Sequence, residues 1–312
     1  MSELLLSAAG ISVTYGRQAA PALRDARLDV PEGAAIGIVG ESGSGKTTLA
    51  RALVGALDPT RGEVLVTGVP WTQVKGNDSR RRTVQMIFQD PLGSLNPSLN
   101  ARQTVAEVFR FWDDMSRAQA NTAAEALLRE VGLGSDVLDS RPARLSGGQC
   151  QRVGIARALA CGPRVLIADE PTSALDVSVQ AQILNLLDAE RKRRSLALVL
   201  VSHDLDVVRH STDHVLVMYD GCVVEEGPTT KVLANPSHPY TRALVDSRPG
   251  HGAFAAPPAT PSTTTGCVYS AKCRFRQDDC QVAQPALLNH GTTSFACLHP
   301  LDTTDAEEGT DL

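Results

Sequence analysis

Two short stretches of this sequence contain the residue types that bind phosphate. The stretch GESGSGKTT, residues 40–48, fits the pattern G-x-x-x-x-G-K-[ST], in which glycines let backbone N–H groups close around phosphate oxygens. Lys46 is placed to reach the β- and γ-phosphates, and the Thr47 hydroxyl to ligate Mg²⁺. We therefore predict that a nucleotide is held by Gly40, Ser42, Gly43, Ser44, Gly45, Lys46, Thr47 and Thr48.

The segments on either side of residues 40–48 are those that such a loop requires. AAIGIVG before it is an apolar run typical of a strand, and KTTLARALVGAL after it has helical periodicity. The positive end of that helix would add to the attraction for phosphate. An ordinary glycine-rich turn is the alternative interpretation, but it does not account for Lys46 and Thr47 at their motif positions.

Two acidic residues end another apolar run, RVLIADE. Asp169 is predicted to hold the hydration shell of Mg²⁺. Glu170 follows directly, where a carboxylate can polarise a water for in-line attack on the γ-phosphate. Two solvated carboxylates without a role are the alternative, but in a chain with a phosphate loop we interpret the pair as completing a hydrolytic site.

The second phosphate-binding stretch is LSGGQ, residues 145–149. Ser146, Gly147 and Gly148 can offer a hydroxyl and backbone amides at the start of the helical segment QRVGIARALA. The stretch contains no lysine, so it is not a second independent nucleotide loop. We predict that it completes a phosphate site made elsewhere.

The remaining patterns predict how the chain is organised. The N-terminal segment favours antiparallel strands, RVLIADEP and LALVLVSHD favour buried parallel strands, and HVLVMYDGCVVEEG favours a hairpin with Asp-Gly at its turn. We expect a nucleotide-binding domain over residues 1–247 with a mostly helical insert at about 90–160. A flexible Pro/Thr/Gly linker at 248–266, a cysteine-containing extension at 267–300 and an acidic, disordered tail at 301–312 are expected to follow.

Composition excludes several classes of protein. With 312 residues and 42% hydrophobic content the chain can bury a core and is not intrinsically disordered. A net charge of −5 gives no global basic field, and we interpret the cluster RKRR at 191–194 as a solvated helix end, so no nucleic-acid partner is expected. Without an apolar run of roughly 18 residues or a signal core, we expect a soluble, cytosolic protein.

The order of motifs, GESGSGKTT, FQDP, LSGGQ, LIADEP, SALD and SHD, resembles the ATP-binding cassette (ABC) ATPase family. The resemblance implies an α/β P-loop NTPase fold with a RecA-like parallel-sheet core, an N-terminal antiparallel β subdomain and an α-helical insert. It also implies that Ser146, Gly147, Gly148 and Gln149 of one subunit close over the ATP held by the other subunit in a head-to-tail dimer.

Four further roles rest on this resemblance alone. Tyr15 would stack on adenine, although a core-facing strand tyrosine is the alternative. Gln89 would sense Mg²⁺ and the attacking water, Asp176 would belong to a loop crossing the dimer interface, and His203 would contact the γ-phosphate. Cys150 stands where the family usually has a polar or basic residue, and this departure changes no phosphate contact that we can identify.

Two local features resemble the ATPases of dipeptide, oligopeptide and nickel importers: FQDPLGSLNP, residues 88–97, and ANPSHPYTRALVDS, residues 234–247. The spacing of Cys267, Cys273, Cys280 and Cys297 also resembles the C-terminal extension of that group, for which a [4Fe–4S] cluster is implied. From the residues alone, zinc and four unliganded thiols stay open as alternatives. A bound metal would have a structural or docking role without a part in hydrolysis.

The resemblance implies an ATPase that drives uptake of peptides or related small solutes. Its expected partners are a second ABC ATPase subunit, identical or a sister chain, two integral-membrane permease subunits and an extracytoplasmic substrate-binding protein. The chain would then lie as a peripheral protein at the cytoplasmic face of the cell membrane. Import of nickel or a metal chelate is the alternative, and a non-transport ABC ATPase acting on nucleic acid or ribosomes is disfavoured because neither a second cassette nor a coiled-coil insertion is visible.

Overall fold

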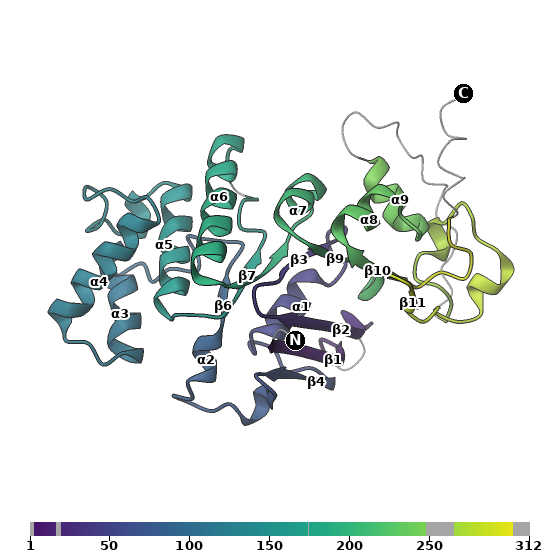
Figure 1. Cartoon of the computed structure of the whole chain (residues 1–312), viewed down its shortest axis with the longest axis horizontal. Coiled ribbons are helices and arrows are strands. Elements are labelled where there is room, and N and C mark those ends of the chain that lie inside the picture. Colours follow the sequence, from purple (N-terminus) through teal and green to yellow (C-terminus); the bar gives the residue numbers. More distant parts are fainter. Residues whose placement is uncertain (1–2, 17–19, 174, 248–264, 302–312) are drawn as a thin grey trace.

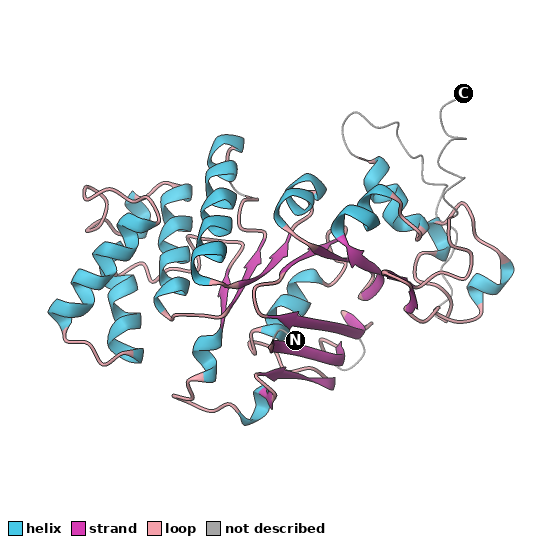
Figure 2. Ribbon diagram, viewed as in Figure 1, coloured by secondary structure: helices cyan, strands magenta, loops and turns pink. Residues whose placement is uncertain are grey.

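Two β-sheets form the framework of the molecule (Figures 1 and 2). In this computed structural model, residues 3–16, 20–173, 175–247 and 265–301 are described. The smaller sheet is antiparallel, with strand order β2-β1-β4-β5. Its strands are β1 (Leu4–Val13), β2 (Leu23–Pro31), β4 (Arg61–Val66) and β5 (Val69–Pro70). The antiparallel β subdomain predicted at the N-terminus is therefore present.

The larger sheet has eight strands in the order β11-β12-β10-β9-β3-β8-β7-β6. Its five strands from β9 to β6 run parallel, while β10, β12 and β11 add antiparallel pairs at one edge. The strands are β3 (Ala35–Val39), β6 (Val84–Ile87), β7 (Val165–Asp169), β8 (Ala197–Val201), β9 (His214–Tyr219), β10 (Cys222–Pro228), β11 (Leu288–His290) and β12 (Thr293–Phe295).

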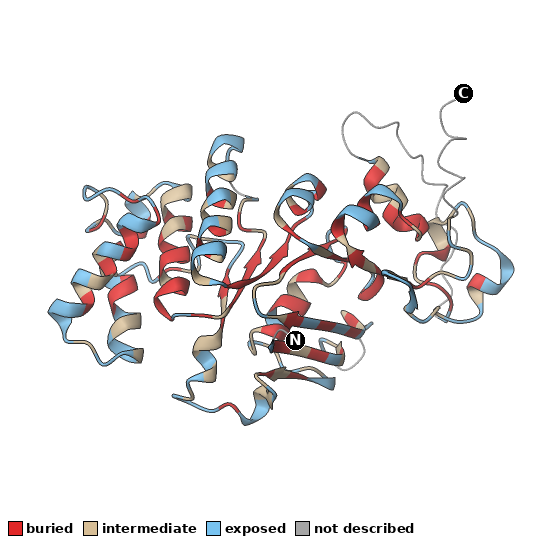
Figure 3. Cartoon of the chain, in the orientation of Figure 1, coloured by how far each residue is buried: buried red, intermediate tan, exposed pale blue. Residues whose placement is uncertain are grey.

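Burial explains why the central strands read as continuous apolar runs. Every residue of β3, β7 and β8 is buried (Figure 3). Alternate residues of one strand enter different cores, because successive side chains point to opposite faces of a sheet. In β7, Val165 and Ile167 pack with the antiparallel sheet, whereas Leu166 and Ala168 pack with the helical insert. Strand β7 thus takes part in two separate hydrophobic cores, and a third core lies around β9 and β10.

Three helices lie within the stretch where the sequence predicts a helical insert, at the end of the molecule away from the C-terminal segment (Figure 1). They are α3 (Ala101–Trp112), α4 (Arg117–Glu130) and α5 (Gly147–Ala160). Each begins with a capping box, formed by Asn100, Ser116 and Ser146 with the glutamine three residues later. These reciprocal hydrogen bonds fix where each helix starts.

The other helices lie outside the predicted insert, and the first of them begins within the phosphate loop. They are α1 (Lys46–Leu53), α2 (Arg80–Thr83), α6 (Val177–Arg194), α7 (Leu205–Ser211), α8 (Thr229–Ala234) and α9 (Pro239–Asp246). The basic cluster at 191–194 ends α6, as predicted, but its arginines are paired: Arg193 and Arg194 both contact Glu130 and Glu190. Among the described residues, no helix is long and apolar enough to cross a membrane.

The predicted Asp-Gly hairpin joins β9 to β10. Asp220 and Gly221 have φ of 44° and 79°, the left-handed conformations that a two-residue hairpin turn needs. Farther along, β12 pairs with β10, so the C-terminal segment at 265–301 extends the larger sheet. The predicted linker falls outside the described residues except for 265 and 266, and the predicted tail except for 301.

Candidate nucleotide site and cysteine cavity

The phosphate loop joins the end of β3 to the start of α1, as its motif predicts. Gly40 has a φ of 152°, and a Cβ there would lie 2.2 Å from the Met218 carbonyl oxygen. Gly45 has a φ of 101°, and a Cβ there would lie 2.5 Å from a backbone oxygen. Both positions therefore require glycine. The Lys46 ammonium donates to the carbonyl oxygens of Gly40 and Glu41 at 2.8 and 2.9 Å, which holds it across the loop.

A cavity of about 470 Å³ opens beside this loop. It brings together predicted site residues from four separate parts of the sequence. Its lining residues are Ala22, Ser42, Gly43, Gly45, Lys46, Thr47, Thr48, Gln89, Glu170 and His203. Of these, Ala22 is not among the residues that the sequence motifs predict.

Thr47 and Asp169 form a pair suited to a divalent cation. The Thr47 hydroxyl donates to Asp169 Oδ1 at 3.2 Å. Burial raises the pKa of the Asp169 carboxyl, and this hydrogen bond opposes the rise. Burial also lowers the pKa of Lys46, against the attraction of Glu170, Asp169 and Glu41. A hydroxyl and a buried carboxylate so close together fit the oxygen ligands that Mg²⁺ prefers.

Glu170 is held from two sides at the end of β7. Its Oε2 accepts a hydrogen bond from Gln89 Nε2 at 3.0 Å, and its Oε1 lies 3.4 Å from His203 Nδ1. The Glu170 backbone has a φ of 44°, a conformation that costs a non-glycine residue of order 1–3 kcal/mol and concentrates at functional sites. The structure thus brings Gln89, Glu170 and His203 into one cluster facing the phosphate loop.

Tyr15 lies at the outer margin of the loop. Its side chain is 47% exposed, which contradicts the alternative of a core-facing tyrosine. Its hydroxyl lies 3.4 Å from Thr48 Oγ1. An exposed ring beside the phosphate loop can serve as a stacking surface for a base.

The LSGGQ stretch does not line the cavity beside the chain's own loop. Ser146 is exposed at the start of α5, where its hydroxyl accepts from the Gln149 N–H at 3.2 Å. A Cβ at position 148 would lie 2.7 Å from Val179, so Gly148 lets α5 approach α6 closely. Cys150 is buried behind the stretch, and its thiol donates to a carbonyl at 3.6 Å. The phosphate-binding groups of this stretch therefore face outward.

Asp176 has a local structural role in the described chain. It caps α6, accepting from the Val179 N–H at 3.0 Å and from the Ser178 hydroxyl at 2.7 Å. These hydrogen bonds lower the pKa of the exposed Asp176 carboxyl. Its predicted role at a dimer interface stays a prediction.

The four C-terminal cysteines surround one small cavity. Cys267, Cys273, Cys280 and Cys297 all line it, together with His238 and His299. The Cys267 N–H donates to the Cys280 carbonyl at 2.8 Å, and a Cβ at position 266 would lie 2.6 Å from that same oxygen. Gly266 thus permits the approach of the first and third cysteines. The sequence predicts the four thiols as a set, and the structure brings them together.

The protonation of these thiols indicates what the cavity can bind. Burial raises the pKa of Cys267 and Cys273, and it raises that of Cys297 to about 12, with further increases from the neighbouring thiols. Thiolates in this place therefore need a cation to offset their charge. No three of the four sulfurs, all of which are described, lie within 4.8 Å of one another. A tetrahedral zinc site places its sulfurs about 3.8 Å apart, so the spacing is wide for zinc.

A tighter group of three possible ligands stands beside the cysteine cavity. Asp279, Cys280 and His299 place one ligand atom each within 4.8 Å of the others, the only such group in the described part of the chain. His299 Nε2 lies 2.9 and 3.0 Å from the two Asp279 oxygens. This contact holds His299 at the wall of the cavity, where a neutral ring nitrogen can serve as a ligand for zinc.

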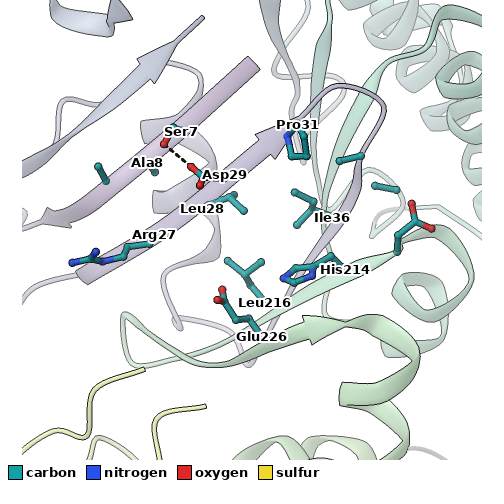
Figure 4. A pocket seen from close by; sticks show the side chains of 14 residues that line it. Ser7, Ala8, Arg27, Leu28, Asp29, Pro31, Ile36, His214, Leu216 and Glu226 are labelled. Atoms are coloured by element: carbon teal, nitrogen blue, oxygen red, sulfur yellow. Dashed lines mark hydrogen bonds between the residues drawn. The ribbon is translucent and has the colours of Figure 1, made fainter. Parts of the chain in front are cut away.

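Another cavity, larger than that beside the phosphate loop, is separate from both sites. It measures about 580 Å³ and lies where the antiparallel sheet meets the starts of β3 and β9 (Figure 4). Asp29, His214 and Glu226 line it, and the Ser7 hydroxyl donates to Asp29 at 2.6 Å. The phosphate loop follows the opposite end of β3, so this cavity takes no part in the nucleotide site.

Besides Ala22, two residues that contact the phosphate loop were missed by sequence motifs. The hydroxyl of Tyr240, in the stretch HPYT, accepts a hydrogen bond from the Glu41 N–H at 2.8 Å. Lys272 Nζ lies 3.6 Å from Glu41 Oε2. Residues 240 and 272 follow the loop by some two hundred positions, and neither belongs to a phosphate motif, so only the fold could reveal these contacts.

Comparison with known proteins agrees with this geometry. Residues 23–173 match the ABC transporter family, and residues 224–280 match the family described as oligopeptide/dipeptide transporter, C-terminal region. A probable peptide ABC transporter ATP-binding protein of Sinorhizobium fredii is 43% identical, over 86% of this chain and 79% of its own. The oligopeptide transport ATP-binding protein OppF of Escherichia coli is 41% identical, over 87% and 85%.

Solved structures give the same picture. The ATP-binding cassette MJ0796, seen as a dimer in a post-hydrolysis state with ADP and phosphate, has a TM-score of 0.67 and 31% identity, covering 72% of this chain and 99% of its own. The protein cbiO1 from Clostridium perfringens has a TM-score of 0.65 and 28% identity, covering 74% and 91%. Fold and site together define a P-loop ATPase.

The chain belongs to the ABC transporter family. The ABC-cassette fold expected from the sequence is confirmed. The expectation of an ABC-type ATPase that binds ATP is confirmed as well.

Proposed function

We propose that this chain is the ATPase subunit of an importer of peptides or related small solutes. The observation that carries the proposal is the arrangement of Glu170 between Gln89 and His203 beside a complete phosphate loop, in a chain that also matches the C-terminal region of oligopeptide and dipeptide transporters. The printed names of the relatives point the same way, since they describe ATP-binding proteins of peptide transport. ATP hydrolysis would supply the free energy for uptake.

Each residue of the site has a role in hydrolysis. The loop amides and Lys46 hold the phosphates, and Tyr15 stacks on the base. Thr47 and Asp169, with Gln89 nearby, would hold Mg²⁺, which neutralises charge on the phosphates when bound. Glu170 accepts a proton from the attacking water. Gln89 and His203 orient Glu170, and His203 is placed to contact the γ-phosphate.

A second subunit completes the site in this proposal. Ser146 and Gly147 are exposed, Gly148 and Gln149 are partly exposed, and none of the four lines the chain's own cavity, which supports a head-to-tail dimer in which they bind the partner's nucleotide. The partner is a second copy or a sister ATPase. Two permease subunits and an extracytoplasmic binding protein would complete the transporter, with this chain attached at the cytoplasmic face of the membrane.

Uptake by a reconstituted transporter tests the function. The chain, its permeases and its binding protein are placed in vesicles, and uptake of a labelled dipeptide and of nickel is measured with internal ATP. ATP-dependent peptide uptake that stops in the Lys46→Ala variant supports the proposal. Uptake of nickel alone would replace peptides by a metal solute, and ATP hydrolysis without uptake of any solute would reject import.

We also propose that the cysteine cavity holds a [4Fe–4S] cluster. Four thiols around one cavity fit the ligand set of such a cluster, and their separation is wide for zinc. The cluster would supply bonds that hold four distant parts of the segment together. Few apolar side chains are available in this segment to do so.

Anaerobic purification tests this assignment. The wild-type chain should be brown, with broad absorption near ~400 nm and with iron and sulfide in matching amounts. Cys273→Ser should bleach it, whereas Cys161→Ser, which alters a buried thiol far from the cavity, should not. Colourless protein with one equivalent of zinc would reject iron and keep the ligands, and His299→Ala would then show whether His299 binds the zinc. Four titratable thiols without metal would reject the site.

A further inference from the structure

A buried histidine in the cysteine cavity has a nitrogen without a partner. His238 is 1% exposed and lines the cavity with the four cysteines. Its Nδ1 accepts the Tyr240 N–H at 3.0 Å, so the ring hydrogen of the neutral imidazole lies on Nε2. Nε2 is buried and has no hydrogen-bond partner in the described structure. A buried N–H donor without an acceptor costs stability, which indicates that an acceptor is supplied by whatever fills the cavity.

The position of His238 is fixed by its backbone as well as its ring. Its N–H donates to Glu225 Oε2 at 3.0 Å, and the neighbouring N–H of Ser237 donates to Glu225 Oε1 at 2.8 Å. Its ring lies 6.0 Å from the Tyr269 ring, which also lines the cavity. Turning the ring away from the cavity would break its hydrogen bond from the Tyr240 N–H. Burial lowers the pKa of His238 to about 3, which keeps the ring neutral.

The four cysteine sulfurs line the same cavity, although none of them is hydrogen-bonded to Nε2 in the described structure. Metal-bound thiolates and the sulfides of an iron–sulfur cluster accept hydrogen bonds, and such bonds tune the properties of the centre. A protonated thiol accepts only weakly. Filling of the cavity with a thiolate-bound metal would thus give His238 the partner that it lacks.

Tyr240 connects the same histidine to the phosphate loop. It is two residues after His238 and 1% exposed, and its hydroxyl accepts the Glu41 N–H at 2.8 Å. Its ring packs against Tyr219 and Tyr269, with centroids 4.6 and 5.4 Å away. Tyr269 belongs to the wall of the cysteine cavity, so the aromatic cluster of Tyr219, Tyr240 and Tyr269 spans the space between cavity and loop.

A second contact joins the cysteine segment to the loop directly. Lys272, which precedes Cys273, lies 3.6 Å from Glu41 Oε2 and 5.6 Å from the centre of the Tyr219 ring. Both charged side chains are well exposed, so this pair contributes little free energy. The partly buried hydrogen bond from the Glu41 N–H to the Tyr240 hydroxyl is the stronger link.

We propose that His238 and Tyr240 couple the cysteine cavity to the phosphate loop, so that filling the cavity with a thiolate-bound metal centre tightens nucleotide binding by this chain. The inference rests on the proposed metal centre and not on the identity of the transported solute. Metal binding orders the wall of the cavity around His238 and Tyr269. The ordered wall fixes the Tyr240 hydroxyl, which accepts the hydrogen bond from the N–H of Glu41 in the phosphate loop. The role concerns nucleotide affinity, and the expectation that the segment takes no part in the hydrolytic step stays a prediction.

Coupling between metal binding and nucleotide binding must be reciprocal, because each ligand changes the affinity for the other by the same factor. If the metal centre tightens nucleotide binding, nucleotide must retain the metal more strongly. Couplings between two sites of a protein commonly amount to factors of about 5 to 150. We expect a factor near the lower end, since a single, partly buried hydrogen bond carries the link.

The test measures Mg-ADP affinity by calorimetry on the full-length chain, once reconstituted anaerobically with iron and sulfide and once stripped of metal. The reconstituted wild type should bind Mg-ADP about fivefold or more tightly than the stripped form. Tyr240→Phe should take up the same amount of iron, yet bind Mg-ADP with the same affinity in both forms. Mg-ADP should also slow the loss of iron to a ferrous chelator in the wild type and not in Tyr240→Phe.

Two further variants separate the proposed link from general damage. Tyr269→Phe removes one oxygen from the same aromatic cluster without a contact to the loop, and it should behave as the wild type. His238→Asn keeps an acceptor for the Tyr240 N–H but withdraws the ring N–H, so it should retain iron while the coupling falls. Equal Mg-ADP affinity of the two wild-type forms would overturn the proposal, as would a chain that takes up no metal. Unchanged coupling in both Tyr240→Phe and His238→Asn would also overturn it. None of these results bears on solute uptake, which tests the proposed function separately.

Discussion

Replacing Glu170 by glutamine should separate ATP binding from ATP hydrolysis. The amide has the same size as the carboxylate, and its carbonyl oxygen can still accept from Gln89 Nε2, which lies 3.0 Å from Glu170 Oε2. The left-handed backbone at position 170 costs glutamine as much as glutamate, so the fold should not change. The one property removed is the ability to take a proton from water.

The magnitude follows from that single loss. A positioned general base contributes roughly 10²- to 10⁴-fold to a rate, equivalent to about 3 to 5 kcal/mol of activation free energy. Binding should not weaken, because Lys46, Thr47 and Asp169 are unchanged and one negative charge near the γ-phosphate is removed. We therefore expect turnover at least ~100-fold slower with ATP affinity equal to or higher than that of the wild type.

Phosphate release and equilibrium ATP binding, both measured on the chain with its partner subunit, check this expectation. Glu63→Gln makes the same chemical change on an exposed position of the antiparallel sheet and should leave both quantities unchanged. Turnover of Glu170→Gln within about threefold of the wild type would show that another group is the base. If Glu170→Gln lost ATP affinity as well as turnover, Glu170 would instead be a residue that binds the nucleotide.

Three other perturbations have defined outcomes. Ser146→Arg should spare ATP binding by the single chain but abolish ATP-driven dimerisation in size-exclusion chromatography. Ser146→Asn keeps the helix cap, so dimerisation by this variant would show that Ser146→Arg acts through loss of the cap or through steric block and not through loss of the serine hydroxyl. Equal loss of binding and dimerisation in Ser146→Arg would place the stretch in its own chain's site. Tyr15→Ala should weaken ATP binding by about tenfold through lost stacking while Tyr15→Phe does not, and a similar loss in both would assign the effect to the hydroxyl near Thr48. Burial raises the pKa of the Glu225 carboxyl above its ordinary 4.5, so the folded chain holds this proton more tightly than the unfolded chain. The free energy of unfolding should therefore fall as pH rises above that value. Glu225→Gln should flatten this part of the plot of melting temperature against pH, and an unchanged slope would contradict the assignment.

Local motifs predicted the residues that the structure brings together beside the phosphate loop, because the residue types that such a loop needs are contiguous in the sequence. Residues 40–48 needed only their own glycines, Lys46 and Thr47 to be recognised, and Asp169 and Glu170 needed only an apolar strand before them. The Asp220–Gly221 turn was predicted for the same reason, since its residue types select its conformation. Gln89, His203 and Tyr15 carry no such local signal, and their places came from the family resemblance.

The cysteine cavity and its link to the loop depend on contacts that no local pattern encodes. The sequence showed four cysteines but not that His238 would join them, because a histidine before Pro239 is as readily explained as a helix cap. The contact of Tyr240 with Glu41 depends on two features of the fold at once: the register of β9 against β10, and the docking of α9. Likewise, the pairing of β12 with β10 follows from the whole sheet and not from the short run TSF.

The division of β7 and β8 between two cores has a consequence for protein engineering. Leu166, Ala168, Leu198 and Leu200 pack in the core of the helical insert, while Val165, Ile167, Ala197, Val199 and Val201 pack in the core of the antiparallel sheet. The insert of a relative could therefore be transplanted by redesigning the first set together with Ile183 and Leu187 of α6, which share its core. The second set would keep its partners, and Asp169 at the end of β7 would keep its position. Chimaeras built this way would allow the docking of the insert to be exchanged while the nucleotide chemistry of the recipient is preserved.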